Sequence, residues 1–176
     1  MPAADTMQLT LERCTIRDYR PSDAPALAKH ANNRKIWLGL RDAFPHPYTI
    51  DDAKRFLEGG VPGLPRIHFC IDIDGHAAGG IGLRPGEDVH RHTAELGYWL
   101  GEEFWGRGIM SEIVPAFVDC CFEKMSLTRI FAMPHSNNPA SARVLEKAGF
   151  VLEGRLAKNV IKDGEILDSL LYAKTI

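Results

Sequence analysis

The sequence predicts an α/β protein of the α+β kind, built on a central, twisted, mixed and mostly antiparallel sheet with helices on both faces. Two strand-like runs, residues 67–72 and 76–83, are joined by an Asp-Gly dipeptide typical of two-residue hairpin turns. A third run, residues 93–100, continues through a glycine-bearing loop and an apolar helical stretch to about residue 125, then to a strand at residues 129–133. An antiparallel hairpin beside a strand–loop–helix–strand unit indicates a mixed sheet.

The N-terminal part alternates strand, helix and loop signals. Residues 9–16 alternate enough to predict a first strand, and the Arg-Pro-Ser-Asp turn that follows predicts a cap for a helix over residues 24–31. Residues 32–48 carry aromatic side chains among prolines and asparagines, which predicts a short helix within an ordered loop. Thr49 is placed to cap a further helix that ends at the glycine pair 59–60.

The C-terminal part predicts two helices and two strands. Pro115 lies inside the apolar helical stretch, where an internal proline costs about 3 kcal/mol, so we expect a kink or a later helix start. Asn138, followed by proline, predicts the N-cap of a helix over residues 139–148. Closing strands are expected over residues 150–161 and 165–172, joined by a Lys-Asp-Gly turn.

Composition and charge narrow the class of protein. A chain of 176 residues with 45% hydrophobic and 25% charged residues is typical of one globular domain, so we assign residues 1–176 to a single domain, with residues 1–7 flexible. A net charge of -2, a pI near 6.4 and no Lys/Arg run argue against a nucleic-acid partner. No leader and no apolar run of ~20 residues is found, so we expect a cytoplasmic protein without a membrane partner.

Cysteine and histidine spacing gives no sign of a metal site. The cysteines form no C-x-x-C pair, so we expect reduced thiols and neither zinc nor disulfides. The histidines at His90, His92 and His135 lack zinc-like spacing and are interpreted as solvated surface imidazoles. The four cysteines are Cys14, Cys70, Cys120 and Cys121.

The most informative stretch runs from a strand into a glycine-bearing loop and a helix, residues 94–114. Such a junction offers free backbone N–H groups and the positive end of a helix dipole, which together bind phosphate without a lysine. The candidate donors are the amides of residues 106–110, and Gly106 and Gly108 would let a pyrophosphate approach the main chain closely. Two glycines before a helix are also typical of an ordinary turn, and the loop matches no P-loop.

Five segments spread over nearly the whole chain favour a phosphate site at this loop over an ordinary turn. They are RPSDA (20–24), PYTIDDA (47–53), ELGYWL (95–100), WGRGIM (105–110) and residues 138–150, which begin with NPAS and end with LEKAGF. Together they resemble the GNAT superfamily of acetyltransferases, in particular its ribosomal-protein-acetyltransferase-like branch. The resemblance implies the GNAT fold, in which a thioester is held where two neighbouring strands diverge.

The resemblance also implies an acetyl-CoA donor site and no metal. The coenzyme A pyrophosphate would lie on the WGRGIM loop and the pantetheine along the preceding strand end. This loop departs from the family pattern at its first and last positions. The implied donor-binding residues are Tyr98, Trp99, Leu100, Trp105, Gly106, Arg107, Gly108, Ile109, Met110, Asn138 and Ser141.

Acetyl transfer needs a neutral amine, a donor for the oxyanion and a proton for the leaving sulfur. Glu95 is the candidate base, acting directly or through water, and a solvent-facing strand carboxylate is the alternative interpretation. Backbone N–H groups of residues 98–100 are the candidate oxyanion donors. Ser141 is the candidate hydroxyl for the leaving thiolate, and a plain first-turn serine is its alternative.

Other assignments stay open at this stage. An N-cap role explains Asn138 fully, and a cofactor contact is an added role. Trp37 and Tyr48 fit either the core or an acceptor pocket.

The predicted function is N-acetylation of a primary amine, either a peptide or protein N-terminus or a small-molecule α-amine, by direct attack in a ternary complex without an acyl-enzyme. The alternatives are a non-catalytic acetyl-CoA-binding sensor and an interaction domain without a cofactor. A homodimer is compatible with the family, and the acceptor is not identified.

Overall fold

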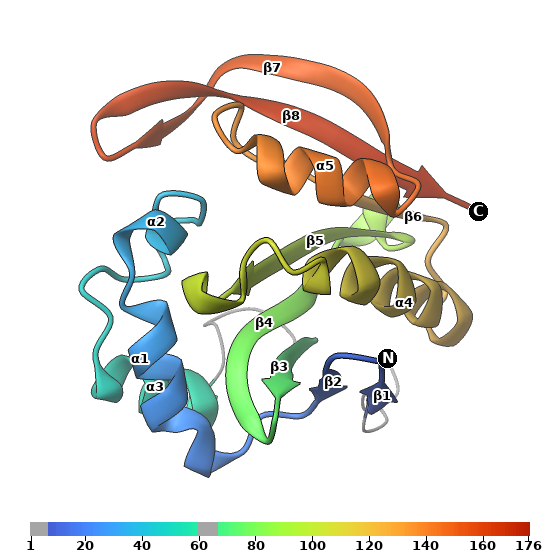
Figure 1. The fold of residues 1–176 in the computed structure, drawn as a ribbon. Helices are drawn as coiled ribbons and strands as arrows, with labels where there is room; N and C mark the ends of the chain where they lie inside the picture. Colours follow the sequence, from blue (N-terminus) through green and yellow to red (C-terminus); the bar gives the residue numbers. More distant parts are fainter. Residues whose placement is uncertain (1–6, 60–66) are drawn as a thin grey trace. The chain divides into compact units, whose positions relative to one another are not determined.

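The computed structural model describes residues 7–59 and 67–176. Its strands form an eight-stranded sheet in the order β1-β2-β3-β4-β5-β6-β8-β7 (Figure 1). The β5–β6 pair is parallel, whereas β1–β2, β2–β3, β3–β4, β6–β8 and β7–β8 are antiparallel. This mixed, mostly antiparallel sheet with its helices confirms the predicted fold class. The strands are β1 (Leu9–Thr10), β2 (Thr15–Arg17), β3 (His68–Ile73), β4 (His76–Pro85), β5 (Thr93–Leu100), β6 (Arg129–Ala132), β7 (Val151–Lys162) and β8 (Glu165–Thr175).

Internal contacts divide the chain into two compact units. The first unit comprises Met1–Arg84 and Gly97–Ile109, and the second comprises Pro85–Leu96 and Met110–Ile176. The assignment of the whole chain to one domain stays a prediction. The expected flexible start falls largely on residues 1–6, which lie outside the described residues, while Met7 is buried.

In the first unit, the prediction of a single strand over residues 9–16 is wrong. The chain turns back on itself instead: Leu11 N donates to the carbonyl of Cys14 at 2.9 Å, and Leu9 in β1 pairs with Ile16 in β2. Polar residues at the centre of the run form this turn, a break that a reading by alternation alone does not detect. The hairpin presents Arg13 at its exposed tip.

The helix expected over residues 24–31 is present as α1 (Ala24–Ala31), preceded by the 3-10 turn η1 (Pro21–Asp23). Asp23 occupies the N-cap position of α1, but its side chain makes no capping bond there, contrary to prediction. The carboxylate is engaged by Arg17 instead. The charged Arg17 guanidinium binds the Asp23 carboxylate more strongly than a neutral helix amide would.

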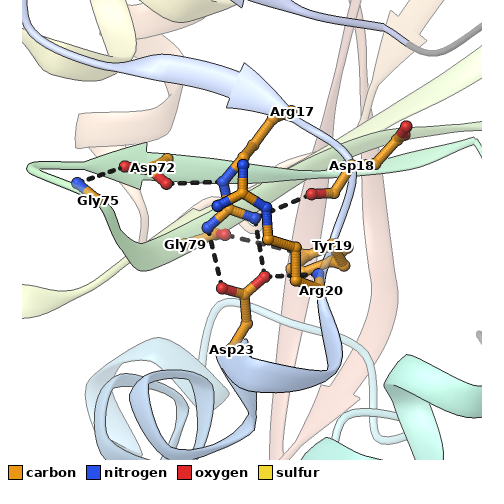
Figure 2. Close-up of polar contacts among 8 residues, drawn as sticks. All are labelled: Arg17, Asp18, Tyr19, Arg20, Asp23, Asp72, Gly75 and Gly79. Atoms are coloured by element: carbon orange, nitrogen blue, oxygen red, sulfur yellow. Dashed lines mark hydrogen bonds and ion pairs between the residues drawn. The ribbon is translucent and has the colours of Figure 1, made fainter.

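Arg17 forms the centre of a buried ionic network (Figure 2). Its Nη1 and Nη2 donate to both oxygens of Asp23 at 2.8 and 2.9 Å, and its Nε donates to Asp72 in β3 at 2.6 Å. Burial works to raise the pKa of Asp23, but the hydrogen bonds from Arg17 and from the Arg20 amide outweigh it and hold that pKa below its usual value. The network fastens the start of α1 to β3.

The short helix expected within residues 32–48 and the helix expected after Thr49 are both present in the first unit. The helix α2 (Arg34–Trp37) is capped by the side chain of Asn33. The helix α3 (Ile50–Gly59) begins with a reciprocal capping box, because Asp52 N donates to Thr49 Oγ1 at 3.2 Å and Thr49 N donates to the Asp52 carboxylate at 2.8 Å. The second glycine of the predicted stop lies outside the described residues. The helices α1 and α3 pack around a shared core that includes Leu27, Ala31, Tyr48, Ala53 and Cys70.

The β3–β4 hairpin confirms the Asp-Gly prediction. Asp74 and Gly75 both have positive φ, 52° and 83°, as a two-residue hairpin turn of the primed type requires. The Asp72 carboxylate accepts a hydrogen bond from Gly75 N at 2.7 Å, which links this turn to the Arg17 network.

The helix α4 (Ile109–Lys124) begins six residues before Pro115, so the later start offered as one expectation is wrong. The proline is accommodated in the helix interior. Its cost of about 3 kcal/mol is small beside the burial of four large side chains, each contributing about 1.5–3 kcal/mol. These fully buried residues are Ile113, Val114, Phe117 and Val118.

The C-terminal elements of the second unit follow the predicted order. The helix α5 (Pro139–Lys147) is capped by Asn138 and ends before Gly149, whose φ is +85°. It packs along β7 and β8 (Figure 1). The β7–β8 turn uses positive φ at Asp163 and Gly164, and β8 continues three residues beyond the predicted end. Over residues 7–59 and 67–176, no helix is long and apolar enough to cross a membrane.

Candidate functional site

The candidate phosphate loop lies between β5 and α4, in the first unit. A 3-10 turn, η3 (Glu102–Phe104), is followed by an exposed turn in which Gly106 and Gly108 have φ of +73° and +75°. Positive φ favours glycine because a Cβ would clash with the backbone. Beyond its two chain neighbours, a Cβ added at Gly106 would meet no heavy atom within 4 Å, so no other part of the described protein covers this side of the main chain.

Three consecutive backbone amides at the glycine-bearing turn of this loop have no acceptor in the described part of the protein. Within the part of the chain that the structure describes, the N–H groups of Gly106, Arg107 and Gly108 donate no hydrogen bond. The turn leads directly into the 16-residue helix α4, whose first amides add further donors and a partial positive charge. The loop therefore has the geometry of an anion site made from main-chain groups.

One side-chain and one main-chain hydrogen bond stabilise the loop. The Trp105 indole Nε1 donates to the Leu100 carbonyl at 2.7 Å, which spans the turn from end to start. Gly101 N donates to the Ala78 carbonyl of β4 at 2.8 Å. The tryptophan at the first loop position, which departs from the family pattern, thus has a bracing role.

The acidic turn η3 is tied to α1 and α2. Glu102 accepts a hydrogen bond from Asn33 Nδ2 at 2.7 Å and also one from Lys35 Nζ. Glu103 accepts from Lys29 Nζ at 3.1 Å and lies 3.4 Å from Nδ1 of His30. Hydrogen bonds from Lys35 and Asn33 lower the pKa of Glu102, and the bond from Lys29 lowers that of Glu103. Sequence reasoning missed these contacts, since no spacing links residues so far apart.

A second missed contact comes from the N-terminal hairpin. The Arg13 guanidinium donates through Nη1 to the carbonyl of Arg107 in the loop. The guanidinium of Arg107 itself lies over the Phe104 ring, with its Cζ 5.7 Å from the ring centroid. The loop is therefore held from the side of β1 and β2 as well.

The strand end at Tyr98, Trp99 and Leu100 is packed tightly against β4. A Cβ added at Gly79 would lie 2.3 Å from the Trp99 carbonyl oxygen, so only glycine allows this approach. Tyr98 and Trp99 are half-buried and Leu100 is buried. The close approach of this strand end to β4 therefore depends on the glycine at position 79.

The two acceptor-pocket candidates differ in burial. Tyr48 is 7% exposed and packs against Phe44, with ring centroids 4.9 Å apart. Trp37 is half-buried and stacks on His46 at 5.5 Å. Tyr48 thus takes the core position that was one of its two interpretations.

Glu95 belongs to the second unit and lies near the end of the parallel pairing between β5 and β6. The register runs from Thr93 opposite Arg129 to Glu95 opposite Phe131, while β5 itself continues to Leu100. Glu95 is half-buried between the buried Ala94 and Leu96. Its carboxylate is therefore on the opposite face of the strand from these core residues.

Asn138 and Ser141 are joined at the start of α5, also in the second unit. The Asn138 side chain accepts from Ser141 N at 3.2 Å, which confirms the N-cap interpretation of Asn138. Asn138 N in turn donates to the His135 carbonyl at 2.9 Å, which closes the turn before the helix. Ser141 is half-buried.

The interpretation of His135 as a surface imidazole is wrong, although it holds for the exposed His90 and His92. His135 is 9% exposed because its backbone pairs with Ser169 of β8 in an antiparallel bridge. No spacing in the sequence signals this bridge.

The four cysteines are free and buried. Burial raises the pKa of the Cys70 and Cys121 thiols to about 12, so neither thiol ionises near neutral pH. Among the described residues, no cluster of three or more His, Cys, Asp or Glu side chains could hold a metal ion.

Comparison with known proteins assigns the family. The acetyltransferase (GNAT) domain family matches residues 13–151, and the chain therefore belongs to the GNAT acetyltransferases. It is an N-acetyltransferase that uses acetyl-CoA as its acetyl donor.

Individual relatives place it more closely. The chain is 30% identical to the ribosomal-protein-serine acetyltransferase of Escherichia coli (strain K12) over 146 residues, 81% of each protein. It is 34% identical to the [ribosomal protein uS5]-alanine N-acetyltransferase of the same strain, over 96% of this chain and 91% of that protein. The fold matches a solved structure of the RimL acetyltransferase in complex with coenzyme A, with a TM-score of 0.85, 23% identity and coverage of 97% and 98%.

Proposed function

We propose that this enzyme transfers the acetyl group of acetyl-CoA directly to the α-amine of a protein or peptide N-terminus, in a ternary complex. The observation that carries the proposal is the exposed turn at Gly106, Arg107 and Gly108, whose amides have no protein acceptor among the described residues. Unsatisfied amides at a helix start suit the diphosphate of coenzyme A.

The donor would lie along residues of both the loop and the strand before it. The diphosphate would accept hydrogen bonds from the amides of the loop and helix start, from Gly106 to Met110. The pantetheine would extend along the strand end formed by Tyr98, Trp99 and Leu100. The family membership and the close, glycine-dependent packing of this strand end against β4 support that arrangement.

Glu95 is proposed as the base, acting directly or through a water molecule. It would take a proton from the ammonium form of the acceptor, after which the nitrogen attacks the thioester carbonyl and forms the C–N bond. A main-chain N–H of the strand end would stabilise the oxyanion. As the C–S bond breaks, the excess proton on the attacking nitrogen would pass to the departing sulfur, directly or through water, so that coenzyme A leaves as the free thiol. The Ser141 hydroxyl would donate a hydrogen bond to that sulfur, and Asn138 would hold that helix start in place.

Direct attack is favoured because the chain offers no evident thiol nucleophile. All four cysteines are buried, and the pKa values of Cys70 and Cys121 are raised to about 12 by that burial. A thiol must ionise and reach the substrate to form an acyl-enzyme.

The α-amine is the acceptor class that the relatives support. Two of them are named for acetylating ribosomal-protein serine and the alanine of protein uS5, and a third is named an L-amino acid N-acetyltransferase. An α-amine with a pKa near 7.7–8.0 is roughly a tenth to a fifth neutral at pH 7, whereas a lysine side chain is well under a hundredth neutral. An α-amine acceptor therefore needs less help from a base than a lysine side chain does.

The test measures thiol release from acetyl-CoA with a matched set of acceptors. Short peptides beginning with serine or alanine would be compared with the same peptides blocked at the N-terminus and carrying an internal lysine, and with free amino acids. We expect turnover with free N-termini and an acetyl group on the α-nitrogen by mass spectrometry. Binding of acetyl-CoA without release of thiol for any amine would indicate a sensor, and an acetylated enzyme would contradict direct transfer.

A further inference from the structure

Arg13 reaches the phosphate loop from a distant part of the sequence. It lies at the exposed tip of the β1–β2 turn and donates through Nη1 to the carbonyl of Arg107, 94 residues further along the chain. A Cβ added at Gly108 would lie 3.0 Å from the same Nη1 atom. The Arg13 guanidinium therefore lies directly against the peptide that joins Arg107 to Gly108.

Fixing that carbonyl also fixes an amide. In a planar trans peptide the C=O and N–H bonds point in opposite directions, so a donor bound to the Arg107 oxygen turns Gly108 N–H away from Arg13. Glycines at positions 106 and 108 leave the loop backbone with more accessible conformations than other residues would. Without a hydrogen-bond partner for the Arg107 carbonyl, the Arg107–Gly108 peptide plane would be free to rotate among these conformations.

We infer that Arg13 is a positioning residue for the donor: it holds the Arg107–Gly108 peptide so that Gly108 N–H faces the diphosphate of acetyl-CoA. The inference rests on the proposed function of this loop. It assigns a role to the N-terminal hairpin, which is otherwise remote in sequence from the donor site.

The experiment compares two donors that differ in the diphosphate. Acetyl-CoA carries it, whereas S-acetylpantetheine has the same thioester arm without it. In the Arg13→Met variant we expect kcat/KM for acetyl-CoA to fall about tenfold, through a higher KM, as loss of one charge-assisted hydrogen bond would produce. The value for S-acetylpantetheine and the KM for the acceptor should not change. Calorimetric binding of coenzyme A and of pantetheine gives the same comparison without turnover.

Two control variants separate positioning from general damage. Arg91→Met removes an exposed guanidinium that donates to a backbone carbonyl of its own turn, that of Asp88, at 3.1 Å, and it should leave both donors unaffected. Arg13→Lys keeps a cationic donor and should recover part of the affinity for acetyl-CoA. Arg13→Gln replaces the methionine variant if that protein aggregates.

The outcomes are distinguishable. Equal kcat/KM for acetyl-CoA in the wild type and Arg13→Met, or an equal loss for both donors, would overturn the role of Arg13 alone. A wild-type enzyme that binds coenzyme A no better than pantetheine would instead show that the loop does not bind the diphosphate, and the proposed function of the loop would fall with it.

Discussion

Replacing Arg17 by methionine tests whether the buried ionic network holds the first unit together. Methionine keeps most of the side-chain volume but removes every hydrogen bond of the guanidinium. These bonds join Asp23 through Nη1 and Nη2 at 2.8 and 2.9 Å, Asp72 through Nε at 2.6 Å, and the Asp18 carbonyl at 2.9 Å (Figure 2). The change leaves two buried carboxylates without a counter-charge.

The expected cost follows from that burial. Arg17, Asp23 and Asp72 are 6%, 5% and 9% exposed, and removing one partner of a buried ion pair typically costs about 3–5 kcal/mol. For a protein of this size each kcal/mol lowers Tm by about 2–4 °C, so a fall of roughly 6–20 °C is expected. The remaining amide donors, from Arg20 to Asp23 and from Gly75 to Asp72, keep the cost within this range.

The stability difference between the wild type and Arg17→Met should also depend on pH. In the wild type the pKa of Asp23 is held below 3.8, so its contribution to stability is complete above that pH and is lost as the pH falls through the lower folded value. In Arg17→Met the Asp23 carboxylate keeps the burial that raises its pKa and loses the Arg17 hydrogen bonds that lower it, so it takes up a proton at higher pH, which relieves part of the penalty. The difference between the two proteins should therefore shrink from pH 7.5 to pH 4.5.

Urea denaturation at both pH values measures this difference. Arg55→Met is the matched control, because it removes an exposed arginine that pairs with Asp52 within α3, and it should cost at most about 1 kcal/mol. A cost for Arg17→Met no larger than that of the control, or one that stays the same at pH 4.5, would refute the reasoning.

Three further predictions concern other parts of the molecule. Burial lowers the pKa of His30 and His68 below 6.5, so their stabilising contribution is complete above pH 6.5 and declines as the pH drops through the lower folded values. The urea midpoint should decrease between pH 7.5 and 5.5, and His68→Gln should make that decrease smaller. If the midpoint of His68→Gln falls with pH as steeply as that of the wild type, burial of His68 is not the cause. Gly108→Ala forces a non-glycine residue to φ of +75°, at about 1–2 kcal/mol, and should weaken coenzyme A binding about tenfold by calorimetry, whereas undiminished binding would show that the loop geometry is unimportant. Glu95→Gln should slow acetylation of a lysine side chain more than that of an α-amine at pH 7, because far less of the lysine is neutral, and equal losses in kcat/KM would contradict its role as base.

Local signals in the sequence were sufficient for most elements. Asn138 at the N-cap and Gly149 after the last turn fixed the ends of α5, and positive φ at Asp74 and Gly75 followed from their residue types. Such features depend on neighbours within a few residues, which a sequence pattern contains. The prediction for residues 9–16 was wrong because a short turn interrupted an otherwise alternating pattern.

Long-range partners could not be predicted in the same way. The side-chain cap expected from residues 20–23 does not form on α1, because Asp23 at its N-cap binds Arg17, which also binds Asp72 in another strand. The loop glycines were predicted, but the bonds of Arg13 to Arg107 and of Asn33 to Glu102 join residues with no periodic relationship. The burial of His135 likewise depends on a bridge to a later strand. These contacts follow from the tertiary fold and leave no local signature.

A crystal structure of the enzyme grown with coenzyme A would test the donor site most directly. We expect diphosphate oxygens to accept hydrogen bonds from the N–H groups of Gly106, Gly108 and Ile109, with the thiol arm alongside residues 98–100. A coenzyme bound elsewhere, with the amides of this turn making no contact to it, would contradict the assignment of the loop.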